Sequence, residues 1–231
     1  MQHIIDYSNK VLGVHTMDHI LVRYGLTAED FNTDEYIISG SATLEAFNPQ
    51  FKCSDLDIYT FNDHISLIDK LVSLGYSKQD GYVYNITDTI PSLDKYVLNV
   101  IKHVHTYKRD NDVVQIMVLN KHTSPTFKLP HDLMNHVDYI YDFSVCTNFL
   151  YNGQVIAIYP IDVKEKRIYI NMLRTTNSAR VYKYLYRGYT FSYNLTNMLA
   201  NKLIYQCGVR IRRNEWNLIT PKMQEQYTFD L

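Results

Sequence analysis

The sequence predicts an α/β (α+β) fold, in which a mixed β-sheet is flanked by helices and the C-terminal part is more helical. Three patterns predict it. Apolar and β-branched runs at 36–39 and 56–61 have the length of buried strands, and a short helix-forming stretch separates them. Strand-like and helix-spaced segments continue to alternate up to about residue 160. From residue 176 to about 205, apolar residues recur at helical spacing.

The length and composition are those of an ordinary globular protein. A chain of 231 residues fits either one elaborated domain or a catalytic domain with a small appendage. We expect a core over residues 1–160 and a mainly helical extension over 161–231 packed on it. Hydrophobic residues make up 46% and charged residues 20%, which disfavours disorder and a coiled coil. The 21 tyrosines fit either an AT-rich genome or a stacking surface.

Charge and cysteine content restrict the partners and the compartment. A formal net charge of −1 argues against a generally basic coat for nucleic acid, although a local patch remains open. The 3 cysteines are odd in number and lack a Cys-x-x-Cys spacing, which disfavours a disulfide framework and a zinc site. Neither a signal peptide nor a bilayer-spanning apolar run is found in the sequence. We therefore expect a soluble, intracellular protein without a membrane partner.

In the N-terminal third, the spacing predicts a helix over 14–24 that ends at Gly25. The first core strand is expected at 36–39, a short helix at 42–47 and the second strand at 56–61. Asn62 or Asp63 would cap the next helix, whose apolar stripe over 65–72 ends before Gly75. Strand and helix thus alternate from the first strand onward.

The middle of the chain continues the sheet. Residues 75–93 carry Gly81 and Pro91 and are expected to form a short strand and a loop. The runs 100–106 and 113–119 flank polar residues and predict a hairpin. A helix at 131–137 and a strand at 139–146 follow. Asn152-Gly153 is typical of a hairpin turn that leads into a strand over 154–159.

Two aspartates in the second predicted strand indicate chemistry. Asp55 and Asp57 are two residues apart, so their side chains should point to the same side of the strand. Two neighbouring carboxylates repel each other unless a positive charge lies between them, and a divalent cation is the usual solution. Gly40 and Ser41 follow the first strand, where backbone N–H groups and a hydroxyl can approach phosphate. Metal and phosphate together suggest nucleotide chemistry.

These residues carry a resemblance to a known family. A strand that ends in Gly-Ser, a short helix and then Ser-Asp-x-Asp in a second strand is similar to the signature of the polymerase-β-like nucleotidyltransferase superfamily; here the matching residues are Gly40, Ser41, Asp55 and Asp57. The context around them looks most like uncharacterised nucleotidyltransferase-fold proteins of fungi and large DNA viruses. The resemblance implies transfer of an NMP group from an NTP to a hydroxyl or phosphate by a two-metal mechanism with Mg²⁺ or Mn²⁺.

The resemblance also implies a third carboxylate on a neighbouring strand. Residues 113–117 offer only the neutral Gln115, whereas 140–144 offer Asp142 in the apolar-Asp-apolar setting that the superfamily uses. We therefore expect Asp142 to join Asp55 and Asp57 as a catalytic and metal-binding residue. The alternative is an aspartate that caps a turn.

A basic helix is the second candidate element. At helical spacing Arg180, Lys183 and Arg187 share one face, where they would meet a triphosphate or a nucleic-acid backbone. We expect Lys183 and Arg187 to bind the nucleotide together with Gly40 and Ser41. A solvated charged face is the competing interpretation.

Two functions stay open at this point. The first is an Mg²⁺-dependent nucleotidyltransferase that uses an NTP, with RNA, tRNA, a protein side chain or a small molecule as acceptor. The second is an inactive member of the same fold that serves as a binding or structural subunit in a viral particle or RNA-processing complex, since proteins can keep a fold after losing its catalytic activity.

Overall fold

The structure is a computed structural model that describes residues 2–31, 36–61, 66–79, 101–119, 141–169 and 178–191. The cap at Asn62 or Asp63, the loop after residue 79, the helix at 131–137 and the helical pattern from 192 onward lie outside the described residues.

The centre of the fold is a seven-stranded mixed sheet, with the order β3-β4-β5-β2-β1-β6-β7. Strands β2 and β5 pair in parallel, and the other neighbours pair antiparallel. The bounds are Tyr36–Ser39 (β1), Leu56–Thr60 (β2), Ser77–Lys78 (β3), Ile101–Arg109 (β4), Asp112–Leu119 (β5), Asn148–Tyr151 (β6) and Gln154–Ala157 (β7). A separate parallel pair consists of Arg167–Ile168 (β8) and Thr190–Phe191 (β9).

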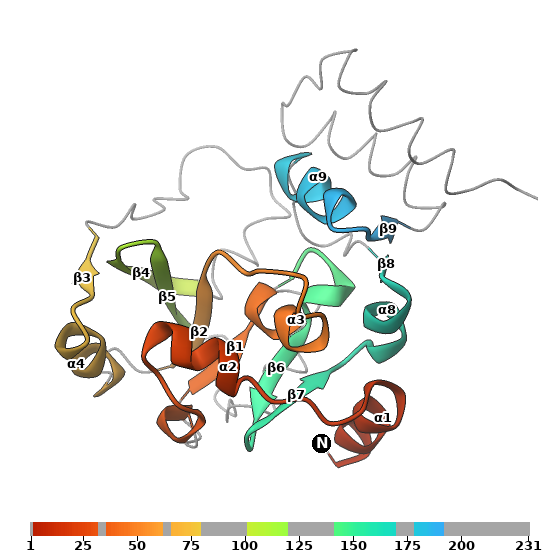
Figure 1. Cartoon of the computed structure of the whole chain (residues 1–231), viewed down its shortest axis with the longest axis horizontal. Helices are drawn as coiled ribbons and strands as arrows, with labels where there is room; N and C mark the ends of the chain where they lie inside the picture. The colour runs from red at the N-terminus through yellow and green to blue at the C-terminus, as the bar shows by residue number, and fades with distance from the viewer. Residues whose placement is uncertain are drawn as a thin grey trace, which may run out of the picture.

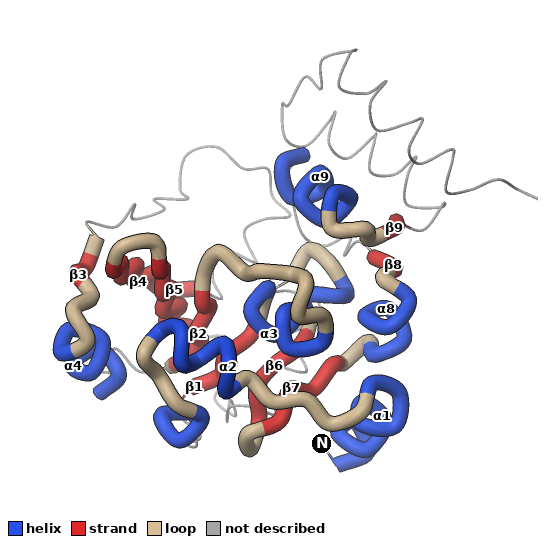
Figure 2. The backbone as a smooth tube through the Cα atoms, in the orientation of Figure 1, coloured by secondary structure: helices blue, strands red, loops and turns tan. Residues whose placement is uncertain are grey.

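Helices flank this sheet, as Figures 1 and 2 show. The described α-helices are Gln2–Leu12 (α1), Asp18–Leu21 (α2), Ser41–Phe47 (α3), Ser66–Ser73 (α4), Pro160–Glu165 (α8) and Ser178–Tyr186 (α9). Short 3₁₀ helices cover Val22–Tyr24, Ala28–Phe31 and Ser144–Cys146. The expected fold class, a mixed α/β sheet flanked by helices, is confirmed. None of the helices in the described ranges is long and apolar enough to cross a membrane.

Most local predictions of the first half are confirmed. Strand β1 and helix α3 lie where the apolar run and the helix-forming stretch predict them, and α4 follows β2. The β4–β5 hairpin turns at Asp110, and the β6–β7 hairpin turns at Asn152-Gly153, with positive φ at all three residues. The helix expected at 14–24 is shorter, since α2 starts at Asp18 and continues as a 3₁₀ turn, but the helical segment does end at Gly25, which has a φ of 74°.

Helix α1 is not predicted by the sequence analysis. It packs on β7 and α8, and its contacts include the Ser8 hydroxyl, which accepts a hydrogen bond of 3.0 Å from the Ala157 amide. Ile4, Ile5 and Leu12 are only partly buried against the core. Because the apolar stripe of α1 is short and interrupted by polar residues, periodicity alone did not reveal it.

The predicted strand at 139–146 is wrong over its described part. Residues 141–143 are irregular, Ser144–Cys146 is a 3₁₀ helix, and the strand β6 begins only at Asn148. Local side-chain bonds explain the difference: the Thr147 hydroxyl donates to the Ser144 carbonyl, and the Asn148 amide donates to the Val145 carbonyl. Such bonds offer the backbone an alternative to a strand ladder.

Helix α9 packs on the same core as the sheet. Tyr184 is almost fully buried, with its ring centroid 5.1 Å from Phe143 and 6.5 Å from Phe51. The described parts of 161–231 therefore contribute to one hydrophobic core with the strands. The domain boundary at residue 160 stays a prediction.

Candidate functional site

The site is built at the end of strand β1, where the sheet brings Asp57 beside neighbours on both sides. Asp57 is in register with Ser39 of β1 and with Gln115 of β5. Residues that are paired in register share one face of a sheet, so these three side chains form a row. Asp57 and Gln115 are half-buried, whereas Ser39 is buried.

Gly40 brings the backbone against the carboxylate of Asp57. It precedes α3 with φ 80° and ψ −147°, a conformation that is essentially limited to glycine. A Cβ atom at this position would lie 2.6 Å from Asp57 Oδ2. The glycine expected from the sequence is therefore required twice, by the turn into α3 and by the close approach of Asp57.

Asp55 lies next to Asp57 and to two serine hydroxyls. Ser54 Oγ donates to Asp55 Oδ1 at 3.0 Å, and Ser41 Oγ lies 3.4 Å from the same oxygen. Burial raises the pKa of Asp57 to about 7, and the negative charge of Asp55 adds to this rise. The structure thus gathers Gly40, Ser41, Asp55 and Asp57 at one place.

Two cations of α9, Arg180 and Lys183, lie near enough to Asp57 to act on its charge. The positive charges of Arg180 and Lys183 oppose the rise in the pKa of Asp57. Burial lowers the pKa of Lys183, repulsion from Arg187 adds to it, and Asp55 counteracts it. These mutual effects place Lys183 within electrostatic reach of both aspartates.

Arg187 is held against the loop that precedes β2. Its Nη2 donates to the Lys52 carbonyl at 3.2 Å, and its guanidinium carbon lies 3.7 Å from the centroid of the Phe51 ring. Among the residues that the structure describes, no hydrogen-bond partner lies near its buried Nη1.

Asp142 is engaged by a neighbouring cation. Arg180 Nε donates to Asp142 Oδ2 at 2.7 Å and Arg180 Nη2 donates to Oδ1 at 2.9 Å, so the ion pair is bidentate. The side chain of Asp142 is only 8% exposed. Over the described ranges, no group of three or more His, Cys, Asp or Glu side chains is arranged to hold a metal ion. The structure thus does not gather Asp142 into a ligand set with the other two aspartates, and its role as third ligand stays a prediction.

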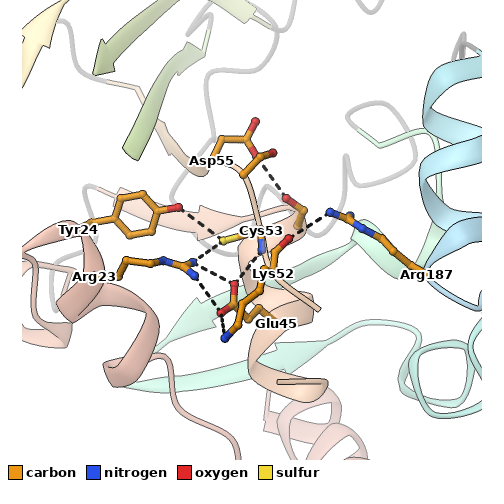
Figure 3. Close-up of polar contacts among 9 residues, drawn as sticks. Arg23, Tyr24, Glu45, Lys52, Cys53, Asp55 and Arg187 are labelled. Atoms are coloured by element: carbon orange, nitrogen blue, oxygen red, sulfur yellow. Dashed lines mark hydrogen bonds and ion pairs between the residues drawn. The ribbon is translucent and has the colours of Figure 1, made fainter. Parts of the chain in front are cut away.

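A buried charge network fixes the loop between α3 and β2, and Figure 3 shows it between Arg23 on one side and Arg187 on the other. Glu45 of α3 is 1% exposed and accepts hydrogen bonds from Arg23, Lys52 and the Cys53 amide. Burial acts to raise the pKa of Glu45, but these bonds together outweigh it and lower the pKa to about 2.

Sequence reasoning missed this network. A charged residue inside the otherwise apolar stretch of α3 was the available signal, because a buried carboxylate needs partners. Glu45 holds Lys52 and Cys53, and the same loop continues to Asp55. The network therefore sets where one of the two carboxylates enters the site.

The residues present fit a divalent cation. Mg²⁺ and Mn²⁺ prefer carboxylate oxygens, and two aspartates supply them: Asp57 in β2 and Asp55 directly before this strand. Burial and the negative charge of Asp55 raise the pKa of Asp57, and a bound cation would oppose both effects. Because Gly40 has no side chain, the backbone there can come close to Asp57 Oδ2.

Comparisons with known proteins give distant structural likenesses. No protein-family model and no curated protein matches the sequence. A tRNA nucleotidyltransferase, crystallised with a primer tRNA and an incoming ATP analogue, is 14% identical with a TM-score of 0.45; the alignment covers 81% of this chain and 49% of that one. A tRNA-processing enzyme in an apo form is 14% identical with a TM-score of 0.38, over 75% of this chain and 37% of that one. The chain spans half or less of the length of these proteins.

Proposed function

We propose that the protein is a nucleotidyltransferase that transfers an NMP group from an NTP to a hydroxyl or phosphate acceptor. The observation that carries the proposal is the strand–glycine–helix–strand unit, in which Gly40 lies against Asp57 and Asp55 lies beside it. Asp55 and Asp57 would hold Mg²⁺ or Mn²⁺. When bound, the cation would neutralise phosphate charge and orient the attacking and leaving oxygens for in-line displacement.

The side chains of this protein would bind and orient the triphosphate. Ser41 offers a hydroxyl at the start of α3, next to Asp55. Lys183 of α9 and Arg187, which follows this helix, carry charges that would offset the repulsion between phosphates and aspartates. Together these groups are therefore suited to a polyanion bound with a cation.

The two-metal form of the reaction makes a further demand on Asp142. To serve as the third ligand and catalytic carboxylate, Asp142 would have to leave its bidentate pair with Arg180. That same ion pair favours a second candidate function, an inactive member of the fold that binds nucleotide or supports a larger assembly.

The experiment that tests the proposal is an incubation with each labelled NTP, with and without Mg²⁺ or Mn²⁺. The acceptors offered are RNA 3′ ends, tRNA, proteins and small hydroxyl compounds. Transfer that needs the cation and is lost in Asp57→Asn supports the proposal. Asp69→Asn, which changes an exposed aspartate of α4, is the matched control and should stay active. Full activity of Asp57→Asn would contradict the proposal, and cation-dependent NTP binding without any transfer would favour the inactive alternative.

Substitution of the basic residues tests the nucleotide side of the site. Lys183→Ala and Arg187→Ala should each raise the KM for NTP about 10- to 100-fold, the loss expected for one charge-assisted contact of about 1.5 to 3 kcal/mol. Lys164→Ala removes an exposed charge on α8 and should leave the KM unchanged. If RNA binding weakens instead and its salt dependence becomes shallower, the face binds the acceptor.

A further inference from the structure

The sheet places a neutral side chain where a third carboxylate would lie next to Asp57. Gln115 of β5 is the in-register neighbour of Asp57 in the parallel pair β2–β5. Its side chain points to the same face and is also half-buried. On the other side of Asp57 the neighbour is Ser39. The row across the sheet therefore contains one carboxylate, flanked by an amide and a hydroxyl.

The other candidate for the third carboxylate is held by an arginine of α9 that also contacts core residues. Arg180 makes two charge-assisted bonds to Asp142, and its guanidinium carbon also lies 5.5 Å from the centroid of the Phe143 ring. Arg180 Nη2 lies 3.8 Å from the Sγ atom of Cys146. These contacts join α9 to the segment that contains Asp142, so releasing Asp142 would also disturb the packing of α9.

We infer that this site takes a single divalent cation, held by Asp55 and Asp57, because Arg180 engages both carboxylate oxygens of Asp142 and the in-register neighbour Gln115 is neutral. The inference rests on the proposed function, since it concerns the cation that accompanies the nucleotide. It assigns Asp142 to the anchoring of α9 and assigns Gln115 as the neutral neighbour that limits the site to one cation.

Equilibrium dialysis of the full chain against Mn²⁺ tests this. The nucleotide probes are α,β-methylene analogues of ATP, CTP, GTP and UTP, each used in turn so that no transfer occurs. The Mn²⁺ and nucleotide retained by the protein are both counted. One Mn²⁺ per retained nucleotide is expected. Two would overturn the inference and leave the proposed function intact, whereas no retention of any analogue would overturn both.

Variants separate the roles of the carboxylates. Asp142→Asn should keep the ratio of Mn²⁺ to retained nucleotide at one, while Asp57→Asn should lower Mn²⁺ retention at least about tenfold. Gln115→Glu places a third carboxylate beside Asp57 and should raise the ratio toward two; Gln79→Glu, at an exposed position after β3, is its control. A ratio below one in folded Asp142→Asn, or a ratio of one in Gln115→Glu, would overturn the inference.

Discussion

The substitution Gly40→Ala tests the central geometry of the site, because it affects the backbone and the carboxylate together. With φ 80° and ψ −147°, alanine at this position would cost about 1 to 3 kcal/mol of unfolding free energy. For a chain of this size the corresponding decrease in Tm is roughly 2 to 12 °C. The new Cβ would lie 2.6 Å from Asp57 Oδ2, so the carboxylate must retreat to a contact of 3.4 Å or more.

That retreat should weaken cation binding beyond any effect on stability. Metal–ligand distances in proteins tolerate only about 0.2 Å, so a displaced Asp57 would be a poor ligand. We expect the affinity for Mn²⁺ with nucleotide to decrease by about 10- to 100-fold. Thermal unfolding measures the first effect, and equilibrium dialysis with Mn²⁺ measures the second.

Gly153→Ala is the matched control. Gly153 also has a positive φ, 74°, but a Cβ there would meet no atom within 4 Å. It should lose about 1 to 2 kcal/mol of stability and keep its Mn²⁺ affinity. If Gly40→Ala binds Mn²⁺ as tightly as Gly153→Ala does, the reasoning about Asp57 is refuted.

Three further predictions concern the charges around the site. The pKa of Glu45 is about 2 in the folded protein and 4.5 when the carboxyl has no partners, so the wild type should lose stability as the pH falls from about 4.5 to 2. Urea unfolding measures the free energy of unfolding against pH, and Glu45→Gln should flatten this part of the curve. Parallel curves for the two proteins would contradict the prediction. Because the pKa of Asp57 is raised to about 7, the cation-free wild type should lose stability as the pH rises from about 4 to 7. With a chelator present, Asp57→Asn should therefore be more stable than the wild type at pH 8 and should lose this advantage toward pH 4. Arg180→Ala should lower the Tm more than Lys183→Ala does. Asp142 loses a bidentate ion pair worth about 1 to 2 kcal/mol, at the lower end because the Arg180 side chain is 41% exposed, whereas Lys183 lies among like charges. Equal Tm values for the two variants would count against the anchoring role of Arg180.

The elements that the sequence predicts correctly depend on contacts between near neighbours. The apolar run of β1, the glycine that follows it and the Asn152-Gly153 turn each reflect the conformational preferences of a few adjacent residues. The spacing of Asp55 and Asp57 likewise suggested their proximity, because one lies directly before β2 and the other at its second residue. The missed helix α1 and the wrong strand at 141–146 are places where a weak periodicity or local side-chain bonds decide the backbone.

The sequence by itself therefore determined that a glycine, a serine and two aspartates meet at a strand end. Only the tertiary structure decided what surrounds them. Arg180 and Asp142 are 38 residues apart, and Arg23 and Glu45 are 22 apart, so neither pair belongs to any local pattern. Which carboxylate gains a cationic partner depends on how α9 and the α3–β2 loop pack on the sheet. This pairing matters because the carboxylates are buried: a carboxylate removed from water needs a positive or hydrogen-bonding partner, and an arginine that pairs with one carboxylate is not available to another.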